Sequence, residues 1–228
     1  MHLRRLLARA VLACVVVACT LSGSAAFAQS RYGRSADEPG RFDFYVLTLS
    51  WSPSYCEAEG DRRNDIQCER PFSFVVHGLW PQHDRGYPAD CDARGQRVPE
   101  RVLDTNTDIF PSKGLMIHEW RKHGTCSGLD PEAYFNAARA LYKRVSIPAS
   151  LAGVIAPKMV DPDAVEAEFR AANAGLAAEA IAVTCDNRRL REVRICYKRD
   201  LSGYVACPEV DRAACRANRT YLPAVRGR

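Results

Sequence analysis

Alternating apolar and polar positions predict four strands along this chain. The stretch 42–51 (FDFYVLTLSW) is aromatic and β-branched, which indicates a strand, and Pro53 should end it. The charged, glycine-containing stretch 57–70 that follows is expected to be a surface loop. The other three strands are expected at residues 72–77, 180–184 and 193–198.

Two longer helices are predicted where an Asp-Pro pair precedes apolar residues at helical spacing. Asp130 is placed to cap a helix whose first turn contains Pro131, and the same pair recurs at 161–162. A shorter helix is expected over 115–123. Because these elements do not alternate as βαβ units, we predict an α+β fold, with helices packed on a central, mainly antiparallel sheet.

The first 28 residues have the pattern of a secretory signal peptide. A basic start precedes the short apolar run 10–18, and Ala26-Phe27-Ala28 predicts cleavage between Ala28 and Gln29. Two alternatives remain open: a lipoprotein site at Cys19 and a twin-arginine signal at Arg4-Arg5. We therefore expect a signal peptide at 1–28, a flexible leader at 29–40 and one domain at 41–228, secreted or periplasmic and not stably attached to a membrane.

Charge and cysteine content restrict the class of protein further. Cleavage would leave 29 basic and 27 acidic residues, a formal net charge of +2 against +5 for the whole chain, so the composition alone does not indicate nucleic-acid binding. The domain keeps eight cysteines without any C-x-x-C pair. An even count behind a signal peptide predicts up to four disulfides, although the residues alone leave 105 pairings open.

The run HEWRKHGTC, residues 118–126, has the composition of an acid–base site. On a helix with steps of about 100°, His118, Glu119, Lys122 and His123 would share an arc of about 140°. A solvated charged face has no need of two histidines, whereas histidine both gives and takes protons near neutral pH.

A zinc site is the nearest alternative for this run. Metalloprotease helices carry H-E-x-x-H, but the spacing between His118 and His123 is one residue longer, so the two imidazoles would diverge by about 140°. Lys122 would also place a positive charge beside the metal. We therefore expect no metal and no other cofactor.

A second candidate motif, FVVHGLWP at residues 74–81, brings His77 to the end of a strand, followed by an exposed-looking Trp80. Taken alone, the motif fits a capped strand end better than a functional site, with His77 bonded locally and Trp80 packed in the core. His83 lies in a polar loop and is expected to be a surface residue.

Together, the segments 74–81 and 115–126 resemble the two signature boxes of the T2 family of secreted ribonucleases, without gaps and in the same order. The strand ending in Trp51-Ser-Pro, the segment 151–157 and the four C-terminal cysteines are similar to that family as well. The resemblance therefore extends over nearly all of the expected mature chain.

This resemblance implies a disulfide-stabilised α+β fold and metal-free cleavage of single-stranded RNA. It implies His77 as proton donor, His123 as proton acceptor and Glu119 as an essential third group. His118 and Lys122 would bind the reacting phosphate, and Trp80 would stack on a base. The implied disulfides are Cys91–Cys126, Cys185–Cys215, Cys196–Cys207 and Cys56–Cys68. Some members carry an acidic residue where this chain has Gln82, so base preference does not carry over.

The chemistry fits these residue types independently of the resemblance. RNA supplies its own nucleophile, the 2′-hydroxyl, so the enzyme needs a base for that proton and an acid for the leaving 5′-oxygen. The expected first product is a 2′,3′-cyclic phosphate, and DNA should not be cleaved. We also expect a monomer. A catalytically silent RNA-binding protein is the remaining alternative, and the intact set of ionisable groups speaks against it.

Overall fold

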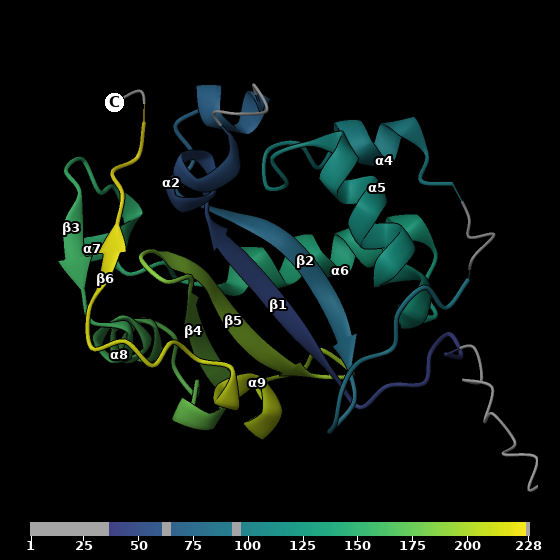
Figure 1. Ribbon diagram of the computed structural model, residues 1–228. Coiled ribbons are helices and arrows are strands. Elements are labelled where there is room, and N and C mark those ends of the chain that lie inside the picture. The colour runs from purple at the N-terminus through teal and green to yellow at the C-terminus, as the bar shows by residue number, and fades with distance from the viewer. Residues whose placement is uncertain (1–36, 61–64, 93–96, 227–228) are drawn as a thin grey trace, which may run out of the picture. The chain divides into compact units, whose positions relative to one another are not determined.

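The computed structural model describes residues 37–60, 65–92 and 97–226, all within the second of two compact units, 36–228 (Figure 1). The expected signal peptide and most of the expected leader therefore lie outside the described residues. The last residues of that leader contact the domain, because the Gly40 N–H donates to the Cys126 carbonyl at 2.9 Å and the Asp37 carboxylate accepts from the Ala89 N–H.

The central sheet has four strands in the order β2-β1-β5-β4, and every neighbouring pair is antiparallel, as predicted. The strands are β1 (Phe44–Trp51), β2 (Phe74–Gln82), β4 (Ile181–Cys185) and β5 (Leu190–Lys198). A separate two-stranded sheet pairs β3 (Lys158–Val160) with β6 (Thr220–Leu222). The small sheet was not expected from the sequence.

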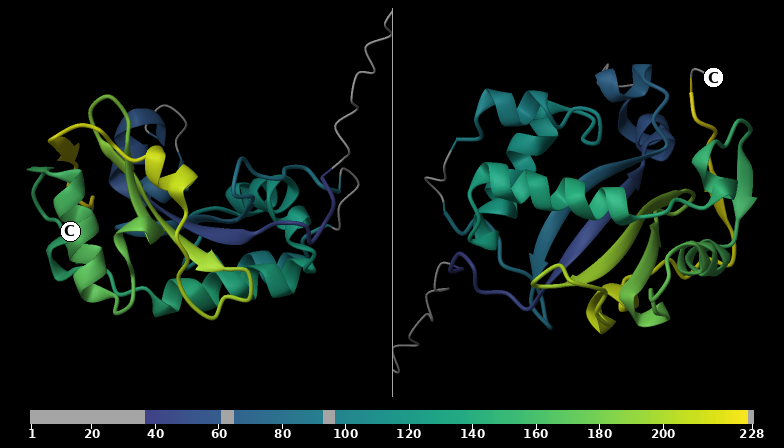
Figure 2. Two further views of the ribbon diagram at one scale, coloured as in Figure 1. Left: turned by 90° about the horizontal axis from the view of Figure 1, so that it is seen from below. Right: turned by 180° about the vertical axis from the view of Figure 1, so that it is seen from behind.

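One face of the central sheet is apolar and forms the main core. Tyr45, Leu47, Leu49 and Trp51 of β1 all belong to this core. The helices α6 (Pro131–Arg144) and α8 (Pro162–Ala172) contribute to it, and α6 crosses behind the sheet (Figures 1 and 2). Both helices begin as predicted, with the Asp130 and Asp161 side chains accepting N-terminal N–H groups.

The opposite face of the sheet is partly polar. A small apolar cluster covers only one part of it, built around Phe44, Val46 and Cys196. The short helix α9 (Pro208–Arg212) contributes Val210 to this cluster. The remaining part is left to polar side chains of β2 and β5, which line the cleft described below.

The second strand extends beyond its predicted end. It continues through residues 78–82, because β1 pairs with it as far as Gln82. The register shifts by one residue, from Thr48 opposite Gly78 to Leu49 opposite Val76, so that His77 lies in a β-bulge. Residues three apart on a regular strand point to opposite faces, and the bulge lets His77 and Trp80 share one face.

Several shorter elements surround this frame. Pro53 does end β1, but as the first turn of α2 (Ser52–Tyr55), and the expected loop 57–70 contains a π-helical turn at Cys56–Gly60 and a 3₁₀ turn at Ile66–Glu69. The other helices are α4 (Glu100–Asp104), α5 (Lys113–Lys122) and α7 (Ala149–Ala152), with 3₁₀ turns at Gly124–Ser127 and Ala178–Ala180.

Four disulfides stabilise this fold. They are Cys56–Cys68, Cys91–Cys126, Cys185–Cys215 and Cys196–Cys207, which is the pairing implied by the resemblance.

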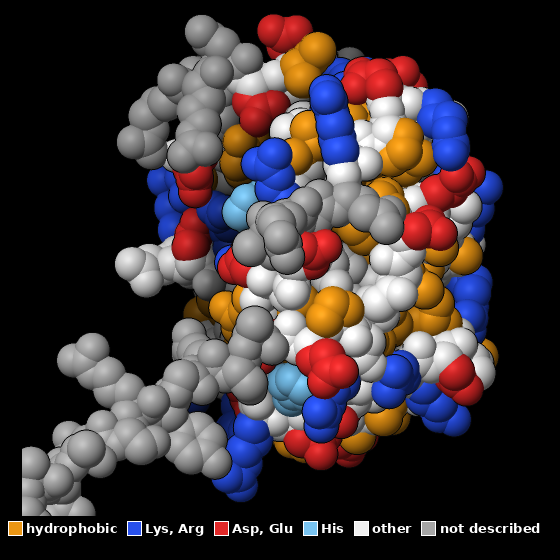
Figure 3. All heavy atoms as spheres, turned by 90° about the vertical axis from the view of Figure 1, so that its right-hand side faces the viewer, with side chains coloured by type: hydrophobic (Ala, Val, Ile, Leu, Met, Phe, Trp, Pro, Cys, Tyr) orange, Lys and Arg blue, Asp and Glu red, His pale blue; other side chains and the backbone are white. Residues whose placement is uncertain are grey.

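Positive and negative side chains are interspersed on the face that carries α4 and α5 (Figure 3), as the near balance of charge suggests. Within the described residues, no helix has both the length and the apolar character needed to cross a membrane.

Candidate active site

The helix α5 supplies one wall of the candidate site. Its first turn is capped by the Ser112 hydroxyl, and Met116 and Trp120 anchor it in the core. The other side of the helix presents His118, exposed, and Glu119, buried. The helix ends at Lys122, and His123 follows as its C-cap with a φ of −119°. The helical spacing used for the sequence prediction therefore holds only as far as Lys122.

The six predicted site residues line one cleft of about 420 Å³. They come from the bulged strand β2 and from the end of α5, and they are His77, Trp80, His118, Glu119, Lys122 and His123. Side chains that the sequence analysis did not single out also line the cleft, among them Tyr87 and Arg194. The two sequence motifs thus form a single site.

Glu119 lies at the centre of this site. One carboxylate oxygen accepts the Trp80 indole N–H at 2.6 Å, and the other lies 3.6 Å from Nε2 of His77. Burial raises the pKa of Glu119, outweighing the opposing effects of His77 and of the Trp80 hydrogen bond. Burial therefore favours the protonated form of Glu119 more than it is favoured in an exposed glutamate.

Gly78 makes the contact between Trp80 and Glu119 possible. A Cβ atom at position 78 would lie closer than 3.0 Å to both the Glu119 carboxylate and the Trp80 ring. Any side chain at this position would therefore force the two groups apart. The glycine of the motif is explained by this close approach to the backbone.

Trp80 is half-buried within the cluster and not exposed as the motif suggested. Its ring centroid lies 5.1 Å from that of His123 and 5.3 Å from that of His77. The guanidinium of Arg194 lies 5.2 Å from its centroid, within cation–π range. Trp80 thus joins both histidines, in addition to its bond with Glu119.

His123 is buried, and its pKa is lowered to about 3 by that burial and by the positive charges of Lys122, His77 and His118. Within the described part of the chain, its Nδ1 atom is buried without a hydrogen-bond partner. A neutral imidazole is therefore strongly favoured here. The neutral imidazole has a ring nitrogen without a proton, which is the form that a general base requires.

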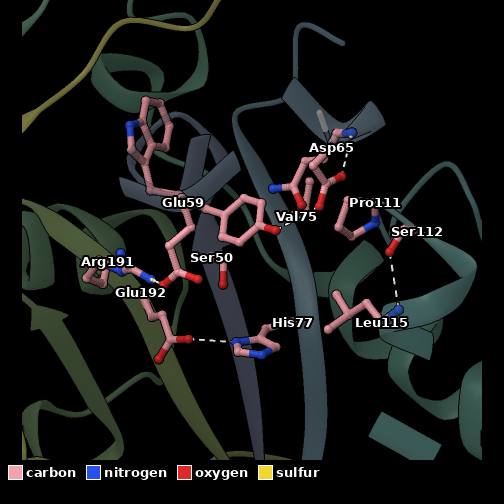
Figure 4. A pocket seen from close by; sticks show the side chains of 13 residues that line it. Ser50, Glu59, Asp65, Val75, His77, Pro111, Ser112, Leu115, Arg191 and Glu192 are labelled. Atoms are coloured by element: carbon pink, nitrogen blue, oxygen red, sulfur yellow. Dashed lines mark hydrogen bonds and ion pairs between the residues drawn. The ribbon is translucent and has the colours of Figure 1, made fainter. Parts of the chain in front are cut away.

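His77 has the opposite environment. Burial lowers the pKa of His77. The Glu192 carboxylate, which bonds Nδ1 at 2.7 Å, and the charge of Glu119 both raise it, and together they outweigh burial, so the pKa is raised. Glu192 lies on β5, on the far side of β1 from His77. The intervening strand contributes the small side chain of Ser50, which lines the same cavity of about 270 Å³ as Glu192 and His77 (Figure 4).

Arg194 fixes Glu192 in turn. The second carboxylate oxygen of Glu192 accepts from Nε and Nη2 of Arg194, at 3.0 and 2.7 Å. His77 and Arg194 together hold the pKa of Glu192 down at about 2, although burial acts in the opposite direction. A continuous chain of bonds therefore runs from Arg194 through Glu192 to His77.

His83 lies outside this cluster. Its side chain is 37% exposed and Nδ1 lies 3.6 Å from a carboxylate oxygen of Asp43. The expectation that His83 is a surface residue agrees with this position.

Comparison with known proteins identifies the family. Residues 42–207 match the model of the ribonuclease T2 family. The chain belongs to this family. The matched range includes both motifs, so the T2 resemblance of the sequence is confirmed.

Individual relatives agree with this assignment. A ribonuclease of Aeromonas hydrophila is 41% identical over 114 residues, which are 50% of this chain and 51% of that protein. The chain thus spans about half the length of that relative. Ribonuclease DdI of Dictyostelium discoideum is 28% identical over 226 residues, 90% of this chain and 93% of that protein.

Solved structures show the T2 fold as well. An RNase-related protein from Calystegia sepium superposes with a TM-score of 0.64 at 21% identity, covering 81% of this chain and 98% of that one. At this level of identity, the likeness is one of fold.

Two side chains bonded to this cluster, Glu192 and Arg194, were not singled out by the sequence analysis. Glu192 and Arg194 alternate with Val193 and Ile195 on β5, and a period of two places both polar side chains on the face opposite the core. That alternation in the sequence could have indicated that both side chains lie on the polar face. Their proximity to His77 could not be predicted from the sequence, because it depends on the order of strands in the sheet.

The side chains of the described residues offer no cluster that could bind a metal ion. Among the residues that the structure describes, no three His, Cys, Asp or Glu side chains lie so that they could bind one metal ion. Activity without metal remains a prediction that chelation must test.

Proposed function

We propose that this protein is a metal-independent endoribonuclease that cleaves single-stranded RNA through a 2′,3′-cyclic phosphate. The observation that carries the proposal is a pair of histidines in one cleft with opposite environments. His77 is bonded to a carboxylate that favours its charged form, whereas the buried His123 lies beside Lys122 and is held neutral.

These environments support distinct roles for the two histidines. The protonated His77 acts as the general acid, and the neutral His123 acts as the general base. The pKa of His123 is lowered to about 3, which favours its neutral form, and the Glu192 carboxylate raises the pKa of His77, which favours its protonated form. Each environment therefore favours the state that the proposed role requires.

In the proposed first step, His123 takes the proton of the 2′-hydroxyl and the 2′-oxygen attacks the adjacent phosphorus. The bond from phosphorus to the 5′-oxygen breaks, and His77 gives its proton to that oxygen. The products are a 2′,3′-cyclic phosphate and a 5′-hydroxyl. Water can then open the cyclic phosphate when the two histidines exchange roles. DNA lacks the 2′-hydroxyl and should not react.

Three neighbouring groups would stabilise the transition state. Lys122 supplies positive charge to the phosphorane oxygens, and the protonated form of Glu119 can donate a hydrogen bond to one of them. His118 is exposed at the rim of the cleft, where it can bind the phosphate of the incoming chain. Burial raises the pKa of Glu119 and so favours the protonated form needed for this role, while Glu192 supplies the charge that favours protonated His77.

Trp80 is the proposed platform for a base of a splayed single strand. Its contacts with Glu119 and Arg194 mean that substrate binding at this ring would act directly on the acid–base groups. The disulfides fit an oxidising compartment, and we propose that the protein acts after export as a monomer, without stable membrane attachment.

One experiment tests the proposal. Purified protein should cleave single-stranded polynucleotides in excess EDTA and release 2′,3′-cyclic phosphate ends, while single-stranded DNA of the same sequence stays intact. Activity that disappears on chelation and returns with zinc or magnesium would refute it.

A further inference from the structure

We propose that Glu192, held in place by Arg194, is the positioning residue of His77, so that the Nε2 atom of this imidazole faces the reacting groups. The inference rests on the proposed function and assigns part of the site to β5, the strand on the far side of β1.

The contacts fix which nitrogen of His77 is available. Nδ1 lies 2.7 Å from a carboxylate oxygen that can only accept while ionised, so Nδ1 must carry a hydrogen. Nε2 is the atom on the side of Glu119, at 3.6 Å, within the cleft. The carboxylate therefore selects the orientation of the ring as well as its charge.

Arg194 makes this arrangement rigid. Its two hydrogen bonds occupy the carboxylate oxygen of Glu192 that His77 does not use, and its guanidinium also lies against Trp80. Arg194 therefore contacts Glu192, which bonds His77, and Trp80, which lies against His123. Because the chain of bonds crosses β1, the position of His77 depends on the pairing of β1 with both β2 and β5.

Other charged groups face His77 less directly. Glu119 approaches from α5, and Glu59, Asp65 and Arg191 line the same cavity as Glu192 (Figure 4). Arg191 lies 4.0 Å from Glu59 and 3.5 Å from Asp186. Glu192 is distinguished from these groups by its 2.7 Å contact with the ring.

A purely structural role for Glu192 would have a different outcome. In that case, the ion pair would only connect β2 to β5 across β1, and its loss would lower stability without a specific effect on His77. The two roles are separated by titrating His77 by NMR and by measuring kcat and KM across pH on the same samples.

The first test is Glu192→Gln, which keeps the shape and removes the charge. We expect the pKa of His77 to fall and the alkaline limb of kcat/KM to move to lower pH. Glu192→Ala should lower kcat by about 10- to 100-fold with little change in KM, less than the 10²- to 10⁴-fold typical of the acid itself. Glu166→Gln is the matched control, because this half-buried carboxylate binds the Val183 N–H outside the cleft.

Arg194→Gln provides an independent test, in which the pKa of His77 should shift in the opposite direction. Its positive charge opposes protonation of His77, so its removal should raise the pKa of His77 while kcat still falls. The NMR titration requires no RNA, so the effect of Glu192 and Arg194 on the pKa of His77 is tested separately from the proposed activity. If folded Glu192→Gln leaves the His77 titration and the pH profile unchanged, the inference is overturned. Should that variant not fold, an unchanged His77 titration in Arg194→Gln would overturn it instead.

Discussion

Replacing Gly78 with alanine should separate activity from stability. The added Cβ would lie closer than 3.0 Å to Glu119 and to Trp80, so at least one of the two groups must shift, either within a compressed site or far enough to break the bond between them. Compression in a well-packed site costs about 1–3 kcal/mol, and loss of the hydrogen bond between them costs a similar amount. Because these are alternative ways to relieve one clash, the free energy of unfolding should fall by about 1–3 kcal/mol.

The effect on activity should be larger. A displacement of about 1 Å in a positioned group can lower a rate by about 10²-fold, and here both Glu119 and the ring between the two histidines would move. Urea unfolding and RNA cleavage should be measured on the same preparation of Gly78→Ala. Gly203→Ala is the control, since a Cβ there meets nothing within 4 Å and should change stability by no more than about 0.5 kcal/mol. A folded Gly78→Ala protein with the wild-type rate would refute the role assigned to this glycine.

Further predictions concern the histidines, the lysine and one disulfide. His123→Ala should fold and lose cleavage by about 10²- to 10⁴-fold, whereas His83→Ala should keep the wild-type rate; circular dichroism and initial rates check both. Lys122→Ala should slow cleavage less than His123→Ala, and parallel rate measurements with an RNA dinucleotide decide this. The pKa of His123 is lowered to about 3 in the folded state, so its contribution to stability is complete above pH 6.5 and is lost as pH falls towards 3; urea unfolding across this range should show a weaker pH dependence in His123→Ala. Replacing Cys91 and Cys126 with serine opens a loop whose ends lie 35 residues apart and should cost about 3–4 kcal/mol, measured by urea unfolding, and an unchanged midpoint would contradict this.

The parts of the fold that local chemistry determines could be predicted from the sequence. The helices that begin after Asp130 and Asp161 start as expected, because an acceptor side chain and a proline act within one turn. The core strands were found because alternation records which face is buried. The paired strands Lys158–Val160 and Thr220–Leu222 were missed, because three residues carry no usable period and their partners lie about 60 residues apart.

The residues of the site could be predicted from the sequence, but their contacts across the sheet could not. The two motifs named the residues of the cleft, and the family resemblance suggested how they meet. The bulge at His77 was not predicted, because a bulge is a property of the pairing between two strands. For the same reason, Glu192 remained unnoticed: its neighbour on the other side of β1 is visible only once the strand order is known.

Under the proposed function, the contact between Glu192 and His77 also determines when the chain can become active during its synthesis. The strand that carries Glu192 is made more than a hundred residues after His77, so a chain still emerging from the ribosome cannot complete the acid of the proposed reaction. The bridge from Cys91 to Cys126, which ends three residues after the cleft residue His123, requires an oxidising compartment to form. Under the proposed function, the messenger and the ribosome that make this protein are therefore not exposed to a finished enzyme.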